Sequence, residues 1–240
     1  MDWWDEHKWK HPSDDKKSLT IACTPCQHFS GRGLFDRNQT LWSSWSILGS
    51  KRYYFAGWSH HLTFANVSDT GYRSVADGQD EDTVPTCPIF KRIGQKYGPF
   101  DLSSFGFLYE KKILINSRIP IGAYSPRHIM SPVHCSPSDS VLLHHDIKSK
   151  LSVGMHWGTF VLTDEPVNQP PEKLKEALVK NKRKLDEFVT INIGETIVSK
   201  DNWIKKDETS IAITLSSSLF EDFYGFMYKW KPLPNLINYL

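Results

Sequence analysis

Three features are scarce in this chain of 240 residues, and each scarcity excludes a class of protein. Its four cysteines are too few for a scaffold held together by disulfides. Neither sign of charge dominates, because 29 Lys and Arg stand against 27 Asp and Glu, so no nucleic-acid partner is expected. No stretch approaches the roughly 18 unbroken apolar residues of a transmembrane helix. The polar, acidic N-terminus is unlike a signal or transit peptide, which predicts an intracellular protein.

The chain is rich enough in apolar residues to form a sizeable core, since 39% of it is hydrophobic and 13% aromatic. Strand patterns occupy residues 18–24, 41–48, 52–56, 151–156 and 188–193, and residues 118–124 form a short buried run. Helix patterns occupy residues 89–97, 136–149 and 172–188, whereas residues 1–17 show no regular period. The second helix starts with a capping Ser136, Pro137 in the first turn and Asp139 three residues after the cap. A hairpin-like first part followed by alternating helices and strands predicts an α/β or α+β layered fold.

Cys23 and Cys26 form a C-x-x-C motif, which can bind zinc or carry out redox chemistry. A zinc ribbon needs a second such pair, and a thioredoxin-type site needs the motif to open a helix. Here Pro25 lies inside the motif and a strand leads into it. We therefore expect these cysteines to be ordinary reduced thiols.

Three segments place a metal-capable side chain at or just beyond the end of a predicted strand. They are residues 24–28 (Thr-Pro-Cys-Gln-His), 68–72 (Ser-Asp-Thr-Gly-Tyr) and 155–159 (Met-His-Trp-Gly-Thr). Strand ends are where α/β folds place functional groups, and two His with one Asp suit zinc. Taken singly, however, a lone His is usually a hydrogen-bonded loop residue, and Asp-Thr-Gly is often only a turn.

Longer motifs contain these segments and carry a resemblance to a known family. Residues 24–28, 41–45 (Leu-Trp-Ser-Ser-Trp), 54–57 (Tyr-Phe-Ala-Gly) and 69–72 resemble a metallo-β-lactamase-fold hydrolase. Residues 98–102 (Gly-Pro-Phe-Asp-Leu), 119–124 (Ile-Pro-Ile-Gly-Ala-Tyr) and 156–160 (His-Trp-Gly-Thr-Phe) resemble one branch of it, the N-acyl-phosphatidylethanolamine-hydrolysing phospholipase D family. The resemblance runs from about residue 2 to about residue 197.

The resemblance implies an αββα sandwich around two zinc ions. His28 would ligate the first zinc, Asp69 would bridge both, and His156 would ligate the second. His134 matches a catalytic-site histidine near the substrate phosphate. The implied reaction is metal-dependent hydrolysis of N-acyl-phosphatidylethanolamine to phosphatidic acid and an N-acylethanolamine. A phospholipid substrate also implies peripheral contact with a membrane, so the expected location is the cytoplasm or the surface of an internal membrane.

The chain departs from the family pattern in two ways. The family's main metal motif, His-x-His-x-Asp-His, is absent, and the nearest string, residues 144–146 (His-His-Asp), has the wrong spacing and lies in a predicted helix. We therefore expect the chain to represent the C-terminal half of the fold, over residues 1–197. Insertions at about 58–68 and 104–118 interrupt continuous motifs, and residues 198–240 form an unassigned tail. Retained intron sequence or missed splice sites would account for the insertions.

Three functions stay open from the sequence. The first is a zinc-dependent phospholipase D, with activity impaired in this chain because three ligands shared by two zinc ions leave both under-coordinated. The second is a catalytically inactive fragment or interaction module of the same fold. The third is another metallo-β-lactamase-fold hydrolase that acts on a soluble phosphodiester or a lactone. Zinc content and the released product would separate them.

Overall fold

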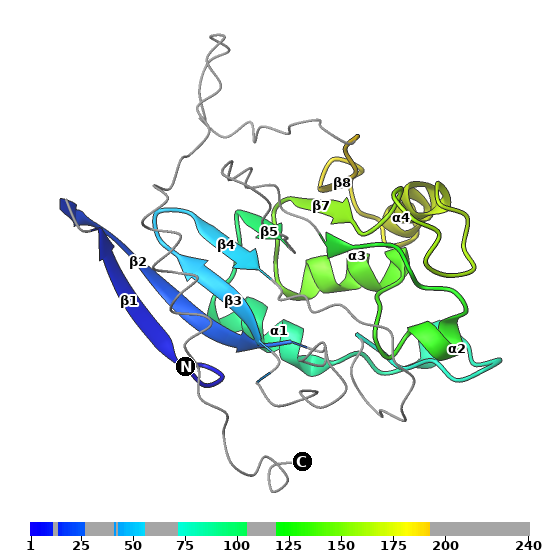
Figure 1. The fold of residues 1–240 in the computed structure, drawn as a ribbon, viewed down its shortest axis with the longest axis horizontal. Helices are drawn as coiled ribbons and strands as arrows, with labels where there is room; N and C mark the ends of the chain where they lie inside the picture. The colour runs from blue at the N-terminus through cyan, green and yellow to red at the C-terminus, as the bar shows by residue number, and fades with distance from the viewer. Residues whose placement is uncertain (12–13, 27–40, 42, 56–71, 105–118, 193–240) are drawn as a thin grey trace, which may run out of the picture. The chain divides into compact units, whose positions relative to one another are not determined.

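The structure is a computed structural model, and it describes residues 1–11, 14–26, 41, 43–55, 72–104 and 119–192. The described residues up to Thr190 belong to one structural unit. Figure 1 shows its ribbon, with strands and helices labelled along the chain. Of the predicted interruptions, residues 58–68 lie outside the described residues, as do residues 105–118 and the tail at 198–240.

A mixed β-sheet organises the described part of the chain. Its strands are β1 (Glu6–His11), β2 (Asp14–Pro25), β3 (Ser43–Leu48), β4 (Arg52–Phe55), β5 (Leu102–Ser104), β6 (Ile119–Pro120), β7 (Ser152–Met155) and β8 (Phe188–Val189). They lie in the order β1-β2-β3-β4-β5-β7-β6, and β8 also pairs with β7. The pairs among the first four strands are antiparallel, and all pairs from β4–β5 onward are parallel.

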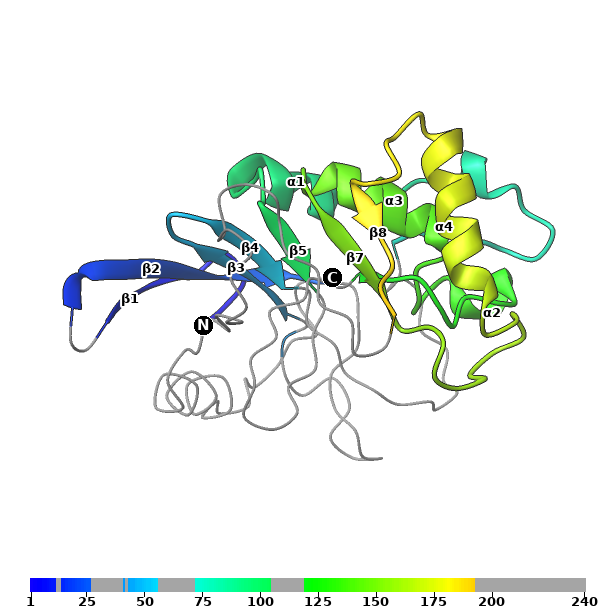
Figure 2. The same ribbon diagram turned by 90° about the horizontal axis from the view of Figure 1, so that it is seen from above.

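Helices pack on one face of this sheet, as Figure 2 shows for α1, α3 and α4. The helices are α1 (Pro88–Lys96), α2 (Arg127–Met130), α3 (Pro137–Asp146) and α4 (Gln169–Lys180), with a 3₁₀ turn η1 at Glu81–Thr83. The α/β layered fold predicted from the sequence is confirmed. In the described residues, one sheet layer and one helix layer are what the expected C-terminal half of an αββα sandwich would contain.

The core lies between the sheet and these helices. Tyr54 and Phe100 from the sheet side are fully buried, with ring centroids 5.4 Å apart. Helix α1 approaches α3 closely because Gly94 has no side chain. A Cβ there would collide with the main chain of Asp146 and Ile147. The helices contribute Phe90, Ile93, Val141, Leu143, Leu174 and Leu178 to the same core.

Two sequence expectations are wrong. Residues 1–17 show no regular period and the sequence predicts no strand there, but β1 lies there and pairs with β2 from Glu6↔Ala22 to Lys10↔Ser18. β1 forms because β2 supplies the strand with which it pairs. Its own polar sequence does not alternate between apolar and polar residues, so the pattern alone does not indicate a strand.

The helix expected at 172–188 is also wrong in its bounds, because α4 spans Gln169–Lys180. The Asn181 side chain donates to the Ala177 carbonyl at 2.8 Å, and Lys182 has a left-handed φ of 54°. Both features end the helix. Leu185, which belongs to the expected apolar stripe, is 53% exposed.

Candidate active-site edge

His156 lies at the carboxyl end of β7, directly after Met155. The strand is buried along Ser152, Val153 and Gly154, which fixes the position from which the histidine leaves the sheet. His156 itself has a φ of 65°, a left-handed conformation that is unfavourable for residues with a side chain. Strained backbone of this kind is often found at functional sites, where the surrounding structure holds it in place.

The neighbouring strand β6 holds the main chain of His156 from one side. Its register with β7 is Ile119↔Gly154 and Pro120↔Met155, and the Ile121 N–H donates to the Met155 carbonyl at 2.9 Å. Gly122 then passes so close to His156 that a Cβ at Gly122 would overlap the His156 carbonyl oxygen. Glycine is therefore required at position 122 for the two strand ends to meet.

His134 comes to the same place along the connection from β6 to α3. Its ring centroid lies 5.1 Å from that of His156, with the ring planes tilted by 33°. Both side chains are half-buried. The structure thus brings together two of the four residues predicted for the site, although they are 22 positions apart in the sequence.

Glu165 links the two segments that carry these histidines. Its carboxylate accepts hydrogen bonds from the main-chain N–H groups of Ala123 at 2.5 Å and Ser125 at 3.0 Å, just after β6. Thr163 donates its hydroxyl to the same carboxylate at 2.5 Å. The connection after β6 and the connection after β7 are therefore joined by one side chain that lies nine residues beyond His156.

Two predicted metal ligands, His28 and Asp69, lie outside the described residues. Among the residues that are described, no three His, Cys, Asp or Glu side chains are grouped so as to hold a metal ion. Of the three predicted ligands, these residues supply only His156. They do not form a metal centre by themselves, because one imidazole is fewer ligands than a zinc ion needs.

The cysteines fit the expectation of ordinary thiols. None of the four, all of which lie in described parts of the chain, forms a disulfide. Burial raises the pKa of the Cys23 thiol to about 12, against the opposing charge of the N-terminus. A thiol that stays protonated is neither a nucleophile nor a good metal ligand.

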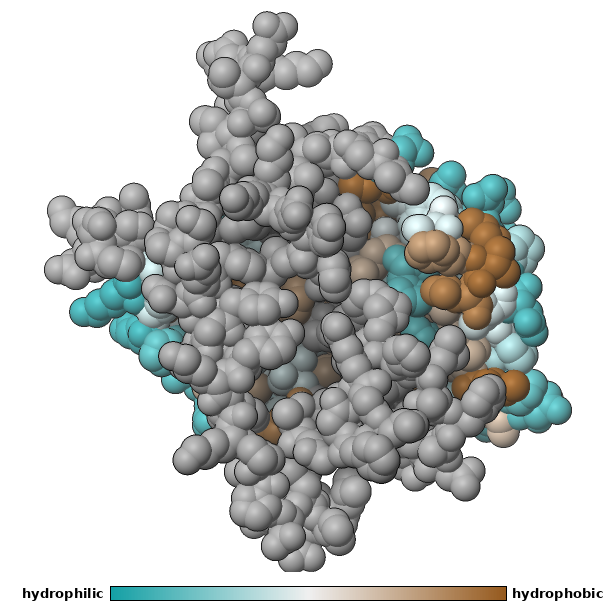
Figure 3. Space-filling view, in the orientation of Figure 1, coloured by the Kyte–Doolittle hydropathy of each residue, from teal (hydrophilic) through white to brown (hydrophobic). Residues whose placement is uncertain are grey.

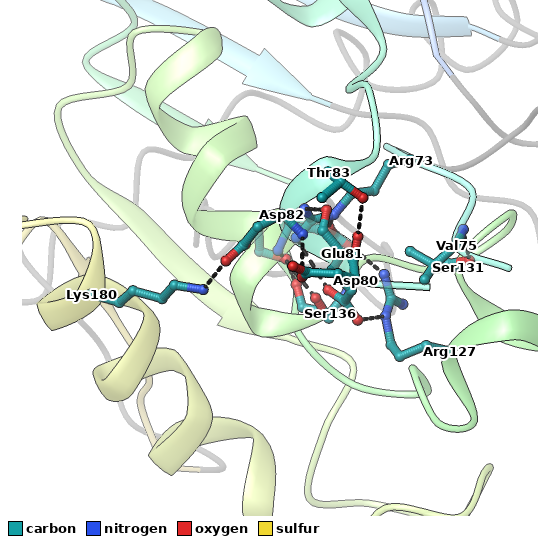
Figure 4. Close-up of polar contacts among 12 residues, drawn as sticks. Arg73, Val75, Asp80, Glu81, Asp82, Thr83, Arg127, Ser131, Ser136 and Lys180 are labelled. Carbon is teal, nitrogen blue, oxygen red and sulfur yellow. Dashed lines mark hydrogen bonds and ion pairs between the residues drawn. The ribbon is translucent and has the colours of Figure 1, made fainter. Parts of the chain in front are cut away.

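Sequence reasoning missed a set of buried charges beside the site. Arg73, Glu81, Arg127 and Asp139 form an ion-pair network close to the segment that carries His134. Figure 4 shows Arg73 and Arg127 converging on this network from different parts of the chain. Only Asp139 had a sequence signal, as the third residue after the capping Ser136, and that signal concerned the start of a helix.

Comparison with known proteins shows which proteins this chain is similar to. A phospholipase from Caenorhabditis elegans, named N-acyl-phosphatidylethanolamine-hydrolyzing phospholipase D 1, is 36% identical over 188 residues, which is 77% of this chain and 42% of that protein. By sequence, the chain is related to the N-acyl-phosphatidylethanolamine-hydrolysing phospholipases D. The resemblance recognised from the motifs is thereby confirmed. A mitochondrial protein of the same name from Saccharomyces cerevisiae is 29% identical over 178 residues, covering 73% of this chain and 29% of that protein.

The remaining comparisons add less. No family model matches the chain. A metallo hydrolase from the archaeon Ignicoccus hospitalis superposes with a TM-score of 0.40 and 18% identity, over 75% of this chain and 52% of that one. The chain spans less than half the length of these phospholipase relatives. What the whole relatives do is therefore a matter of proposal for this chain.

Proposed function

We propose that the complete protein is a zinc-dependent phospholipase D that hydrolyses N-acyl-phosphatidylethanolamine to phosphatidic acid and an N-acylethanolamine. The observation that carries this proposal is the pairing of His134 with His156 at the carboxyl edge of the sheet, in a chain related to phospholipases of that name. The four residues proposed for the site are His28, Asp69, His134 and His156.

The described residues suggest distinct roles for the two histidines. His156 is held at the strand end by the close approach of Gly122 and by Glu165, which ties the connection after β7 to the one after β6, and this suits a rigid metal ligand. His134 lies on a connection rather than at a strand end. An imidazole N–H there can donate a hydrogen bond to a phosphate oxygen, so we assign it to the substrate phosphodiester.

The proposal is tested on the protein encoded by the complete transcript of this locus, with the 240-residue chain measured beside it. Release of N-acylethanolamine is followed by mass spectrometry, and bound zinc is measured by elemental analysis. His156→Ala and Asp69→Ala should remove zinc and abolish release. His134→Asn should keep zinc but lower the rate by about 10²-fold or more, because a hydrogen bond made to the reacting phosphate is lost.

The matched control is His145→Ala, which removes an exposed histidine on α3 and should change neither readout. Normal zinc and rate in His156→Ala would show the ligand assignment to be wrong. A complete protein without zinc or turnover would favour the inactive fragment or interaction module. Turnover of a soluble phosphodiester or lactone alone would favour another hydrolase of the same fold.

An exposed apolar segment supports the proposed contact with a membrane surface. Phe160, Val161 and Leu162 follow His156 by four to six residues, and Phe160 and Val161 are 73% and 78% exposed. Figure 3 shows hydrophobic atoms in brown over the region where Figure 1 draws the connection from β7 to α4. Consecutive exposed apolar residues are typical of interaction sites. Among the described residues, no helix has the length and hydropathy of a membrane span.

Binding to phosphatidylcholine vesicles tests this contact independently of zinc and turnover. Phe160→Ser combined with Val161→Ser should reduce the fraction of protein that co-sediments with vesicles. The control combines Val179→Ser with Leu185→Ser, which removes two exposed apolar side chains at another place. Equal loss in both double variants would show that exposed apolar area, and not this segment, determines binding. The proposed location is accordingly the cytoplasm or the surface of an internal membrane.

A further inference from the structure

Four charged side chains from separate segments form one buried network beside His134. Arg127 donates to Asp139 at 2.6 Å and to Glu81 at 2.6 Å. Arg73 donates to the same two carboxylates, at 2.5 Å and 3.2 Å. Each arginine therefore bridges both acids, and the four charges balance. Figure 4 shows Arg127 directed into this network and Ser136 close to it.

The network is buried at Asp139 and Arg73 and opens towards the surface at Glu81, whose side chain is 27% exposed. The side chain of Asp139 has no exposed surface, that of Arg73 is 2% exposed and that of Arg127 is 19% exposed. Removing charges from water carries a large desolvation cost, and well-packed apolar residues of similar size often stabilise a protein equally well or better. The stability of the fold therefore does not explain a buried charge cluster of this kind. A need to hold the surrounding segment in one geometry does explain it.

The geometry that it fixes is that of the segment carrying His134. Arg127 lies at the start of this segment and Asp139 at its end, so their ion pair closes a stretch with His134 inside it. Asp139 also accepts the main-chain N–H of Ser136 at 3.0 Å, two residues after His134. Within the closed stretch, the His134 N–H donates to the Met130 carbonyl at 2.8 Å.

Arg127 also reaches His134 itself. Its third nitrogen lies 3.5 Å from the His134 carbonyl oxygen, at the long limit of a hydrogen bond. One guanidinium thus contacts both acids and the main chain of the histidine. A lysine ammonium is a point charge without this planar fork, so it cannot reproduce all three contacts.

We propose that Arg127 is a positioning residue, which holds the His134 ring in its place against His156 through the bridge to Asp139. The inference rests on the proposed function, because the pair has a catalytic meaning only in a hydrolase site. Its test, however, needs neither zinc nor turnover. Arg127 acts through His134 and is not assigned any contact with substrate.

The experiment uses NMR of the 240-residue chain with ¹³C-labelled histidine. A cross-ring nuclear Overhauser effect (NOE) between His134 and His156 reports their pairing. The ring signals of His144 report the fold, because this histidine is buried against Phe188 with ring centroids 5.7 Å apart. Arg127→Lys and Asp139→Asn should lose the cross-ring NOE while the His144 signals keep their wild-type positions.

Lys180→Met is the matched control, since it removes a neighbouring ion pair to Asp82 of 2.6 Å, and neither partner lies in the His134 segment. It should keep the NOE. The proposal is overturned if Arg127→Lys keeps the NOE at wild-type intensity, if the wild type lacks it, or if Lys180→Met loses it too. Loss of the His144 signals in both network variants would also overturn it, because Arg127 would then be a folding residue. If the NOE behaves as expected in all variants but the complete protein has no phospholipase activity, only the proposed function is refuted.

Discussion

Acidification should destabilise the fold through His144, a histidine of α3 outside the proposed site. Its side chain is fully buried, and its Nδ1 lies 2.8 Å from the Ser152 hydroxyl of β7. Burial, with smaller contributions from Arg183 and His145, lowers its pKa from 6.5 to about 4. Between pH 6.5 and pH 4, His144 therefore binds a proton in the unfolded chain but not in the folded chain. The contribution of His144 to stability is full above pH 6.5 and is lost as the pH falls towards 4.

The size of the effect follows from the two pKa values. A difference of one pKa unit corresponds to about 1.4 kcal/mol, so the loss from this single group is about 2 kcal/mol at pH 5 and about 3 kcal/mol at pH 4. The Glu187 carboxylate, 3.9 Å from Nε2, would favour a charged imidazole. However, Arg183 binds that carboxylate at 2.8 Å and offsets its charge, so the lowered pKa stands.

Urea unfolding of the wild type and of His144→Asn at pH 7 and pH 5 measures this loss. The asparagine amide can still form a hydrogen bond with the Ser152 hydroxyl but cannot titrate. Between the two pH values, the wild type should lose about 2 kcal/mol more than the variant. Taking the difference removes the contribution of all other titrating groups. Equal losses of unfolding free energy in the wild type and in His144→Asn would refute the reasoning.

Three further predictions concern the site and its surroundings. Gly122→Ala should abolish turnover in the complete protein, because the new methyl group collides with the His156 carbonyl, whereas Gly49→Ala has only ordinary contacts at 3.7 Å and should keep wild-type turnover. Asp139→Ala should lower the free energy of unfolding by about 3–5 kcal/mol, because the buried Arg73 and Arg127 keep only Glu81 as an acidic partner, whereas Lys180→Met removes an exposed ion pair and should cost much less; equal losses in chemical denaturation would contradict this. Cys23→Ser and Cys26→Ser should leave zinc content unchanged, and zinc loss in either would restore the C-x-x-C motif as a metal site.

The features that could be predicted from the sequence are those encoded by neighbouring residues. Ser136, Pro137 and Asp139 predicted a helix start, and the structure has a complete capping box there, in which Ser136 and Asp139 each accept from the other's main chain. Likewise β3 and β4 form the predicted hairpin, paired from Trp45↔Phe55 to Leu48↔Arg52. In both cases the interacting residues lie within about ten positions of each other, so a local pattern contains the information.

The features that escaped prediction depend on partners from other segments. The strand β1 exists because β2 offers it an edge, and the charges of Arg73 and Arg127 are buried because Asp139 and Glu81 meet them from elsewhere in the chain. Nothing in the residues around an arginine distinguishes a buried one from an exposed one. For the same reason, the pairing of His134 with His156 could be anticipated only through the family resemblance, since spacing along the chain does not imply it.

The physical origin of that pairing is the topology of the sheet. Strands β6 and β7 are parallel neighbours, so the connections that leave them both begin at the same edge. One connection carries His134 towards α3 and the other carries His156 towards α4. Gly122 then allows the strand ends to meet, and Glu165 joins the two connections. These contacts all lie within the described residues, and together they bring His134 and His156 to the same edge of the sheet.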